Sequence, residues 1–145
     1  MRESDSREGV PPALGTRLPE RRRVLSPQVI TAYAEASGDR NPIHLDQEYA
    51  RRAGLPATIA HGMLTLGVAC AEVEAWAGEE PWVGRVACRF STPVVAGETI
   101  AISGVVVGSD EAAATVELSV LISPGERALT KARVDLRAAG APSSP

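Results

Sequence analysis

The chain has 145 residues and a formal net charge of −3, with 44% hydrophobic but only 3% aromatic residues. This length suits one domain with an aliphatic core. The acidic balance argues against nucleic acid as the main partner, because phosphate binding needs a basic face. No apolar run approaches the roughly 20 residues that span a bilayer, and the chain does not begin with a secretory signal pattern.

Two cysteines, Cys70 and Cys88, are too few for a disulfide or metal framework, and both lie in apolar sequence. We therefore expect free thiols in a reducing compartment, which predicts a cytoplasmic protein. No metal site, no cofactor and no membrane partner are expected.

Both ends of the chain are polar. Residues 1–12 end in Pro-Pro and predict a disordered leader, and residues 140–145 predict a flexible tail. The sequence between them, 13–139, contains no internal repeat and predicts a single domain.

The first half of this domain predicts a strand followed by helices. Ser26 is a suitable N-cap for the first helix and Gly38 ends it, while Asp46 and Gly54 bound a second, shorter helix. Between the two helices, the Asn-Pro pair at 41–42 favours extended or turn backbone. The expected elements are a strand within 13–25 and helices over 27–36 and 47–52.

Residues 63–77 predict a long helix that is apolar almost all round, which indicates a buried helix. Glu72 and Glu74 lie toward its far end, where we expect it to emerge into solvent. Beyond it, four segments rich in Val, Ile and Thr alternate with turn signals and predict an antiparallel meander. These strands are expected over 82–92, 99–107, 112–122 and 127–137. The pattern predicts an α+β fold in which a sheet wraps one helix.

Asp39 and His44 are five residues apart, across a turn stiffened by Pro42. If their side chains converge, they can hold one water or hydroxyl group, with one member accepting a proton while the other donates one. Addition or removal of water across a double bond requires such a pair. The alternative is that Asp39 only ends the preceding helix and His44 is an ordinary surface or core histidine. Spacing alone leaves both interpretations open.

His61 and Gly62 open the long helix. The first N–H groups of a helix have no partner within it and carry the positive end of its dipole. Gly62 has no side chain to block approach, so these groups suit a thioester oxygen that becomes negatively charged. The alternative is that Gly62 only eases a tight turn into the helix.

Three segments resemble the MaoC-like family, which includes (R)-specific enoyl-CoA hydratases and (3R)-hydroxyacyl-ACP dehydratases. Residues 33–46, YAEASGDRNPIHLD, look like its hydratase motif. Residues 59–67, IAHGMLTLG, resemble the start of its central helix, and 90–98, FSTPVVAGE, resemble its next strand and turn. The resemblance covers roughly residues 16–137.

This resemblance implies a hot-dog fold, a long helix wrapped by an antiparallel β-sheet. It implies that Asp39 and His44 hold the water that adds to C3 of a 2-enoyl thioester or leaves in the reverse reaction. The carrier would be CoA or acyl-carrier protein, and the chain would form a homodimer, or a heterodimer with a related subunit. Supporting roles would fall to Asn41 and Pro42 in the loop, and to Gly62, His61 and Met63 around the thioester.

One position departs from the family pattern. Some hydratases support the catalytic aspartate with a serine on the central helix, at a place that falls near Cys70 here. Three other functions stay open: the catalytic half of a heteromeric dehydratase, a hot-dog thioesterase that uses Glu72 or Glu74, and a module that binds acyl-CoA without turnover.

Overall fold

The computed structural model describes residues 9–142, which form five strands and four helices. In chain order the elements are β1 (Arg17–Val24), α1 (Pro27–Ser37), α2 (Pro42–Leu45), α3 (Gln47–Arg52), α4 (Gly62–Ala77), β2 (Trp82–Phe90), β3 (Thr99–Ser109), β4 (Ala113–Ser123) and β5 (Glu126–Arg137).

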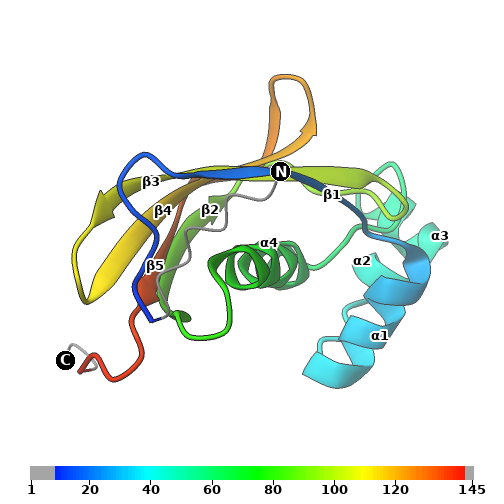
Figure 1. Ribbon diagram of the computed structural model, residues 1–145. Coiled ribbons are helices and arrows are strands. Elements are labelled where there is room, and N and C mark those ends of the chain that lie inside the picture. The colour runs from blue at the N-terminus through cyan, green and yellow to red at the C-terminus, as the bar shows by residue number, and fades with distance from the viewer. Residues whose placement is uncertain (1–8, 143–145) are drawn as a thin grey trace.

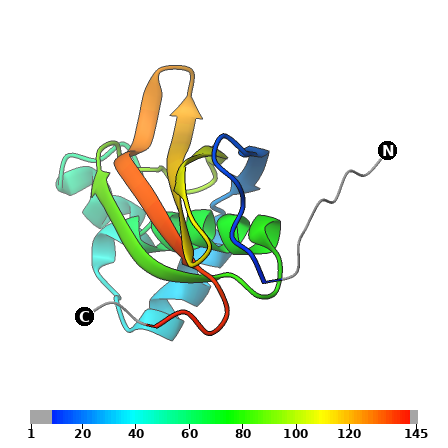
Figure 2. The ribbon, with the colours of Figure 1, turned by 60° about the vertical axis from the view of Figure 1, so that its left-hand side comes forward.

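The five strands form one antiparallel sheet in the order β1-β3-β4-β5-β2. α4 lies across one face of this sheet, and α1, α2 and α3 cluster beyond one end of it (Figure 1). The turned view in Figure 2 shows the β4–β5 hairpin projecting past the rest of the sheet. This arrangement confirms the α+β, hot-dog prediction.

The core lies between α4 and the sheet. Along α4, Leu64, Ala69 and Val73 are buried, and strand residues such as Ile100 and Leu136 are fully buried. Burial of each large aliphatic side chain contributes about 1.5–3 kcal/mol, so this interface dominates the stability of the domain. The predicted helix is present, but it is buried only on the face toward the sheet, because Met63, Gly67 and Ala71 on its other face are exposed.

The predicted meander is only partly correct, because β2 does not pair with β3. β2 pairs with β5 at the edge of the sheet, and β3 pairs with β1 and β4. The chain between β2 and β3 crosses from the β2 edge to the opposite half of the sheet, where β3 lies between β1 and β4. On the way, the Val94 carbonyl accepts a hydrogen bond from the Ala60 N–H, and the Gly97 N–H donates to the Leu25 carbonyl, both at 2.8 Å. These long-range bonds have no signature in local sequence.

Two local expectations are also corrected. The segment after Asn41 is the short helix α2 rather than a turn, because Pro42 begins it and the Asn41 side chain accepts a hydrogen bond from the Ile43 N–H. Glu72 is 9% exposed rather than at a solvated helix end, and its Oε1 lies 2.6 Å from Nε of Arg23 on β1. Glu74 is exposed, as expected.

The described chain extends slightly past the predicted domain limits. Of the expected leader, residues 1–8 lie outside the described residues, whereas Pro11 is buried and the Pro12 carbonyl accepts a hydrogen bond from Ser109. Residues 143–145 of the expected tail also lie outside. The longest helix, α4, has 16 residues, and within 9–142 no helix has the length and apolarity needed to cross a bilayer.

Candidate active site

The loop that follows α1 is shaped by a glycine C-cap and two side-chain hydrogen bonds. Gly38 ends α1 with a φ of 80°, and Oδ1 of Asp39 then accepts a hydrogen bond from the Asn41 N–H. Oδ1 of Asn41 accepts in turn from the Ile43 N–H at 3.2 Å, which starts α2. The single turn of α2 brings His44 back toward Asp39. The residues predicted to support the loop, Asn41 and Pro42, therefore build the element that carries the histidine.

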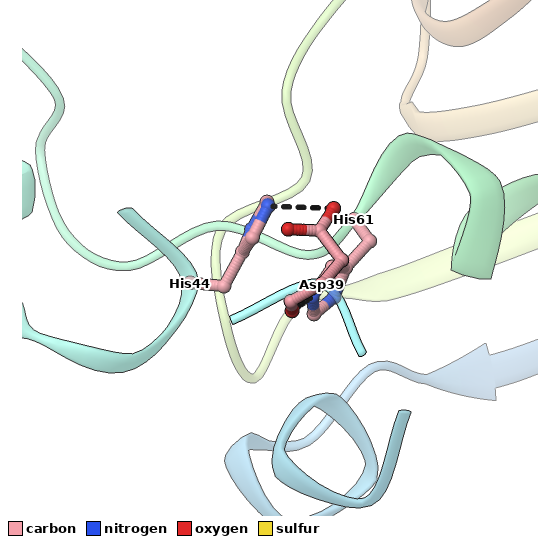
Figure 3. Close-up of side chains that lie close together, drawn as sticks. All are labelled: Asp39, His44 and His61. Atoms are coloured by element: carbon pink, nitrogen blue, oxygen red, sulfur yellow. Dashed lines mark hydrogen bonds and ion pairs between the residues drawn. The ribbon is translucent and has the colours of Figure 1, made fainter. Parts of the chain in front are cut away.

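Asp39 and His44 face each other across a short gap (Figure 3). Nδ1 of His44 lies 2.7 Å from the Ile59 carbonyl oxygen, and since a carbonyl only accepts, Nδ1 carries the proton. Nε2 of His44 is then the lone-pair nitrogen, and it lies 4.0 Å from Oδ2 of Asp39. This distance exceeds a direct hydrogen bond but allows one water to bridge the two atoms.

The two side chains differ in exposure. The His44 side chain is 8% exposed, whereas that of Asp39 is 54% exposed. The imidazole is thus held in a fixed place by its surroundings, while the carboxylate remains accessible from solvent.

A cavity of about 410 Å³ opens beside this pair. Its wall is largely apolar, apart from His44 and several hydroxyl side chains. It is lined by Ile43, His44, Ile59, Ala60, Gly62, Thr65, Phe90, Ser91, Thr92, Pro93, Val94, Ala128 and Leu129. The lining residues therefore come from α2, the start of α4, the connection between β2 and β3, and β5, among other segments.

The N-terminus of α4 points its first residue, Gly62, into this cavity. Among the described residues no side chain caps α4, so its first N–H groups remain available to a ligand. The helix dipole adds partial positive charge at this point. The cavity wall thus combines His44 with a site suited to a developing oxyanion, while Asp39 faces His44 from outside the lining.

The predicted catalytic and substrate-binding residues differ in whether they line the cavity. Gly62 and His44 line the cavity. Met63 is 58% exposed and lies outside the lining, while His61 is 2% exposed, with its Nε2 atom 2.9 Å from the backbone carbonyl oxygen of Asp39. Their assignment to substrate contact stays a prediction.

Thr65 and Phe90 are among the lining residues that were not predicted from the sequence. Thr65 follows Gly62 by three positions, which places it on the same face of α4. Helical periodicity from Gly62 is a signal that can find it. Phe90 reaches the cavity only because β2 pairs with β5, and local sequence carries no such signal.

Candidate ligand atoms of Asp39, His44 and His61 lie within 4.8 Å of one another, so a metal ion has to be considered. The rings of His44 and His61 stack at a centroid distance of 3.7 Å with an interplanar angle of 25°. A metal ligand uses the lone pair in the ring plane at about 2.1 Å. Nearly parallel stacked rings do not direct these lone pairs at one ion, so the geometry fits proton transfer better than metal ligation.

The family of MaoC like domains matches residues 12–123. Among curated proteins, 3-hydroxyacyl-thioester dehydratase X of Mycobacterium tuberculosis is 39% identical over 87 residues, which cover 59% of this chain and 30% of the relative. The peroxisomal enoyl-CoA hydratase 2 of Arabidopsis thaliana is 35% identical over 94 residues, covering 60% and 30%. The chain thus matches about a third of the length of these relatives.

Among solved structures, a chain of the ChsH1–ChsH2 complex from Mycobacterium tuberculosis superposes with a TM-score of 0.79 at 25% identity, covering 87% of this chain and 98% of that one. The matched family segment contains α1 to α4 and most of the sheet, including Asp39, His44 and Gly62. The chain therefore belongs to the MaoC-like domain family.

Proposed function

We propose that this protein catalyses the reversible hydration of 2-enoyl thioesters to (3R)-hydroxyacyl thioesters, with CoA or acyl-carrier protein as the carrier. One observation carries the proposal: the lone-pair nitrogen of His44 faces the carboxylate of Asp39 at 4.0 Å, beside a cavity that also contains Gly62. The names of the hydratase and dehydratase relatives support the same reaction class.

A water molecule between Nε2 of His44 and Oδ2 of Asp39 meets two acceptors. It therefore donates both hydrogens and turns a lone pair toward the substrate. Attack on C3 forms the C3–O bond and releases one water proton to the pair. The pair returns one proton to C2, which completes the C2–H bond. Because both groups come from the same face, we expect syn addition.

The thioester carbonyl becomes enolate-like as water adds to C3, and negative charge grows on its oxygen. The Gly62 N–H, at the positive end of the α4 dipole, is placed to accept that charge. The apolar remainder of the cavity suits the acyl chain, and Phe90 and Leu129 form part of its wall.

The direct test compares Asp39→Asn and His44→Ala with the wild type on crotonyl-CoA and longer enoyl thioesters, followed by loss of enoyl-thioester absorbance. Each change should lower kcat by about 10²–10⁴-fold, because each removes one partner of the proton transfer. Glu35→Gln, at an exposed site on α1, controls for the loss of one charge and should keep activity. Full activity in both site variants, with the fold intact by circular dichroism, would refute the assignment.

The thioesterase alternative requires an acidic residue of α4 at the substrate. Glu72 instead pairs with Arg23 on β1. Neither Glu72 nor Glu74 lines the cavity. An assay for thiol release from acyl-CoA separates hydrolysis from hydration. Binding of acyl-CoA without either reaction would favour the third alternative, a non-catalytic module. A screen of CoA and acyl-carrier protein thioesters of graded length would then define the carrier and chain.

We further propose that the protein acts in the cytoplasm as a homodimer. β2 is an edge strand that pairs only with β5 among the described strands, and its Trp82 and Phe90 side chains are 43% and 54% exposed. A second copy paired along β2 would satisfy that edge. Light scattering should give the mass of two chains. A stable monomer that becomes active only with a second, related subunit would favour the heteromeric alternative, as the ChsH1–ChsH2 complex illustrates for another protein.

A further inference from the structure

His61 is a buried side chain that the proposed proton transfer does not use. It is 2% exposed, and its Nε2 atom lies 2.9 Å from the backbone carbonyl oxygen of Asp39. Because a carbonyl oxygen only accepts hydrogen bonds, Nε2 of His61 must carry the proton. Nδ1 is then unprotonated, and it has no hydrogen-bond partner among the residues that the structure describes. Among the described residues, the ring of His61 therefore makes one hydrogen bond, to the backbone carbonyl of Asp39.

The ring of His61 also contacts two other aromatic side chains. It stacks on His44 at 3.7 Å between centroids, and it tilts against Tyr33 of α1 at 4.8 Å and 58°. His44 is held along its edge by the bond to the Ile59 carbonyl, and His61 adds a contact on its face. Together these contacts restrict rotation of the catalytic imidazole.

His61 is at the same time the N-cap residue of α4. Its carbonyl accepts the hydrogen bond from the Thr65 N–H at 3.1 Å, and the next residue is Gly62. One residue thus joins the backbone of Asp39, the ring of His44 and the helix terminus that faces the thioester (Figure 3). His61 is thus one direct link between the acid–base pair and the Gly62 N–H, beside the bond from His44 to the Ile59 carbonyl.

We propose that His61 is a positioning residue, which fixes Asp39 and His44 relative to the N-terminus of α4 by the hydrogen bond from its Nε2 atom to the Asp39 carbonyl. This inference rests on the proposed hydration and deepens it. His61 contributes no atom to the cavity wall, so it acts through its neighbours and not on the substrate.

Two substitutions separate the hydrogen bond from the ring. His61→Gln keeps an N–H donor near the position of Nε2 but removes the ring, and His61→Phe keeps a ring but removes the donor. The Phe variant should lose roughly 100-fold in kcat with KM little changed, because a displacement near 1 Å at the reacting groups has this effect. The Gln variant should recover most of that loss. Val73→Ala, in the α4 core away from the cavity, should lower the melting temperature without lowering kcat.

Wild-type kcat in His61→Phe would overturn the proposal. The proposal would also be overturned if the Phe and Gln variants lost kcat equally and their melting temperatures fell equally. That result would favour a purely structural role for His61.

A second readout does not depend on activity. The chain has only two histidines, so ¹⁵N-histidine spectra of the untagged protein contain two imidazoles, which the His61 variants assign. His61 should show the Nε2–H tautomer and His44 the Nδ1–H tautomer. An Nδ1–H tautomer at His61 would overturn the proposed bond even in an active enzyme. A wild type with these tautomers that hydrates no thioester would refute the proposed function, and with it the positioning role of His61 in hydration.

Discussion

The aromatic ring of Phe90 lies against the first residue of α4, so closely that a Cβ atom on Gly62 would stand 2.9 Å from Cδ1 of Phe90. Both residues line the same cavity, although one begins a helix and the other ends a strand 28 positions later. A glycine at position 62 therefore has two effects. It leaves room for the Phe90 ring, and it keeps the first N–H groups of α4 accessible.

Gly62→Ala should reduce activity without unfolding the protein. The added methyl group displaces the half-exposed Phe90 ring and stands beside the N–H proposed to bind the thioester oxygen. We expect kcat/KM to fall about 10- to 100-fold, less than the roughly 10²–10³-fold loss from removing an oxyanion donor, because the N–H group itself remains.

Gly67→Ala is the matched control on the same helix. Among the described residues nothing lies within 4 Å of a Cβ atom at Gly67. This change should stabilise the protein by about 0.5–1 kcal/mol through helix propensity and leave the rate unchanged. Equal activity in the two variants would show that Gly62 has no special role.

Phe90→Ala should change the acyl-chain preference. The ring is 54% exposed and forms one wall of the cavity, so its removal enlarges the cavity at little cost in stability. The ratio of kcat/KM for long over short enoyl thioesters should rise about 10-fold, a typical value for one to two methylene groups in an apolar pocket. Trp82→Ala, at the other end of β2 and outside the cavity lining, should leave this ratio unchanged.

The sequence predicted which residues the structure brings together at the candidate site better than the path of the chain. Asp39 and His44 are joined by a capped turn, and the N-terminus of α4 follows from its apolar length, so local sequence made them candidates. Their spacing left two interpretations open, and the resemblance to the MaoC-like family favoured the catalytic one. The strand order was not predictable in this way, because β2 pairs with β5, and the chain then crosses to β3 through a connection held by bonds to residues far away in the chain.

Features that depend on long-range packing were missed for the same reason. Phe90 enters the cavity because of where β2 is placed, and Glu72 is buried because β1 brings Arg23 over the helix. His61 was found, but as a residue beside the thioester. Its bond to the Asp39 carbonyl spans 22 positions and has no local signal.

Asn41→Ala tests whether α2 positions His44. Loss of the Asn41 side-chain cap should destabilise the protein by about 1 kcal/mol and lower kcat, because the single turn that carries His44 loses its start. Ser26→Ala removes an equivalent 3.2 Å cap from α1 and should have a similar effect on stability alone. Equal kcat values in the two variants would contradict the positioning role of α2.

Breaking the pair of Arg23 and Glu72 should cost stability but not activity. Glu72 is nearly buried, and Arg23→Met leaves its carboxylate without this cation. Because the Arg23 side chain is half exposed, we expect a loss of about 1 kcal/mol rather than the larger value of a fully buried pair. Denaturant unfolding of Arg23→Met, Glu72→Gln and the double variant measures the coupling. If Glu72→Gln, but not Glu74→Gln, lost thiol release from acyl-CoA, the thioesterase alternative would instead be favoured.

Asp110 should make part of the stability depend on acid. In the β3–β4 turn its Oδ1 accepts hydrogen bonds from the N–H groups of Ala112 and Ala113, each at 2.8 Å, and these bonds lower the pKa of its carboxyl below the usual 3.8. A lowered pKa in the folded state means that the stabilisation is complete above the unfolded value and is lost as the pH falls through the folded one.

Asp110→Asn should therefore melt below the wild type at pH 7, and the difference in melting temperature should shrink as the pH falls below 3.8. Glu111→Gln removes a negative charge from the same turn, where none of the turn hydrogen bonds described above is lost. It should melt close to the wild type at neutral pH. A melting difference for Asp110→Asn that stays constant from pH 7 to below the lowered pKa would show that the charged form of Asp110 is not what the two N–H groups stabilise.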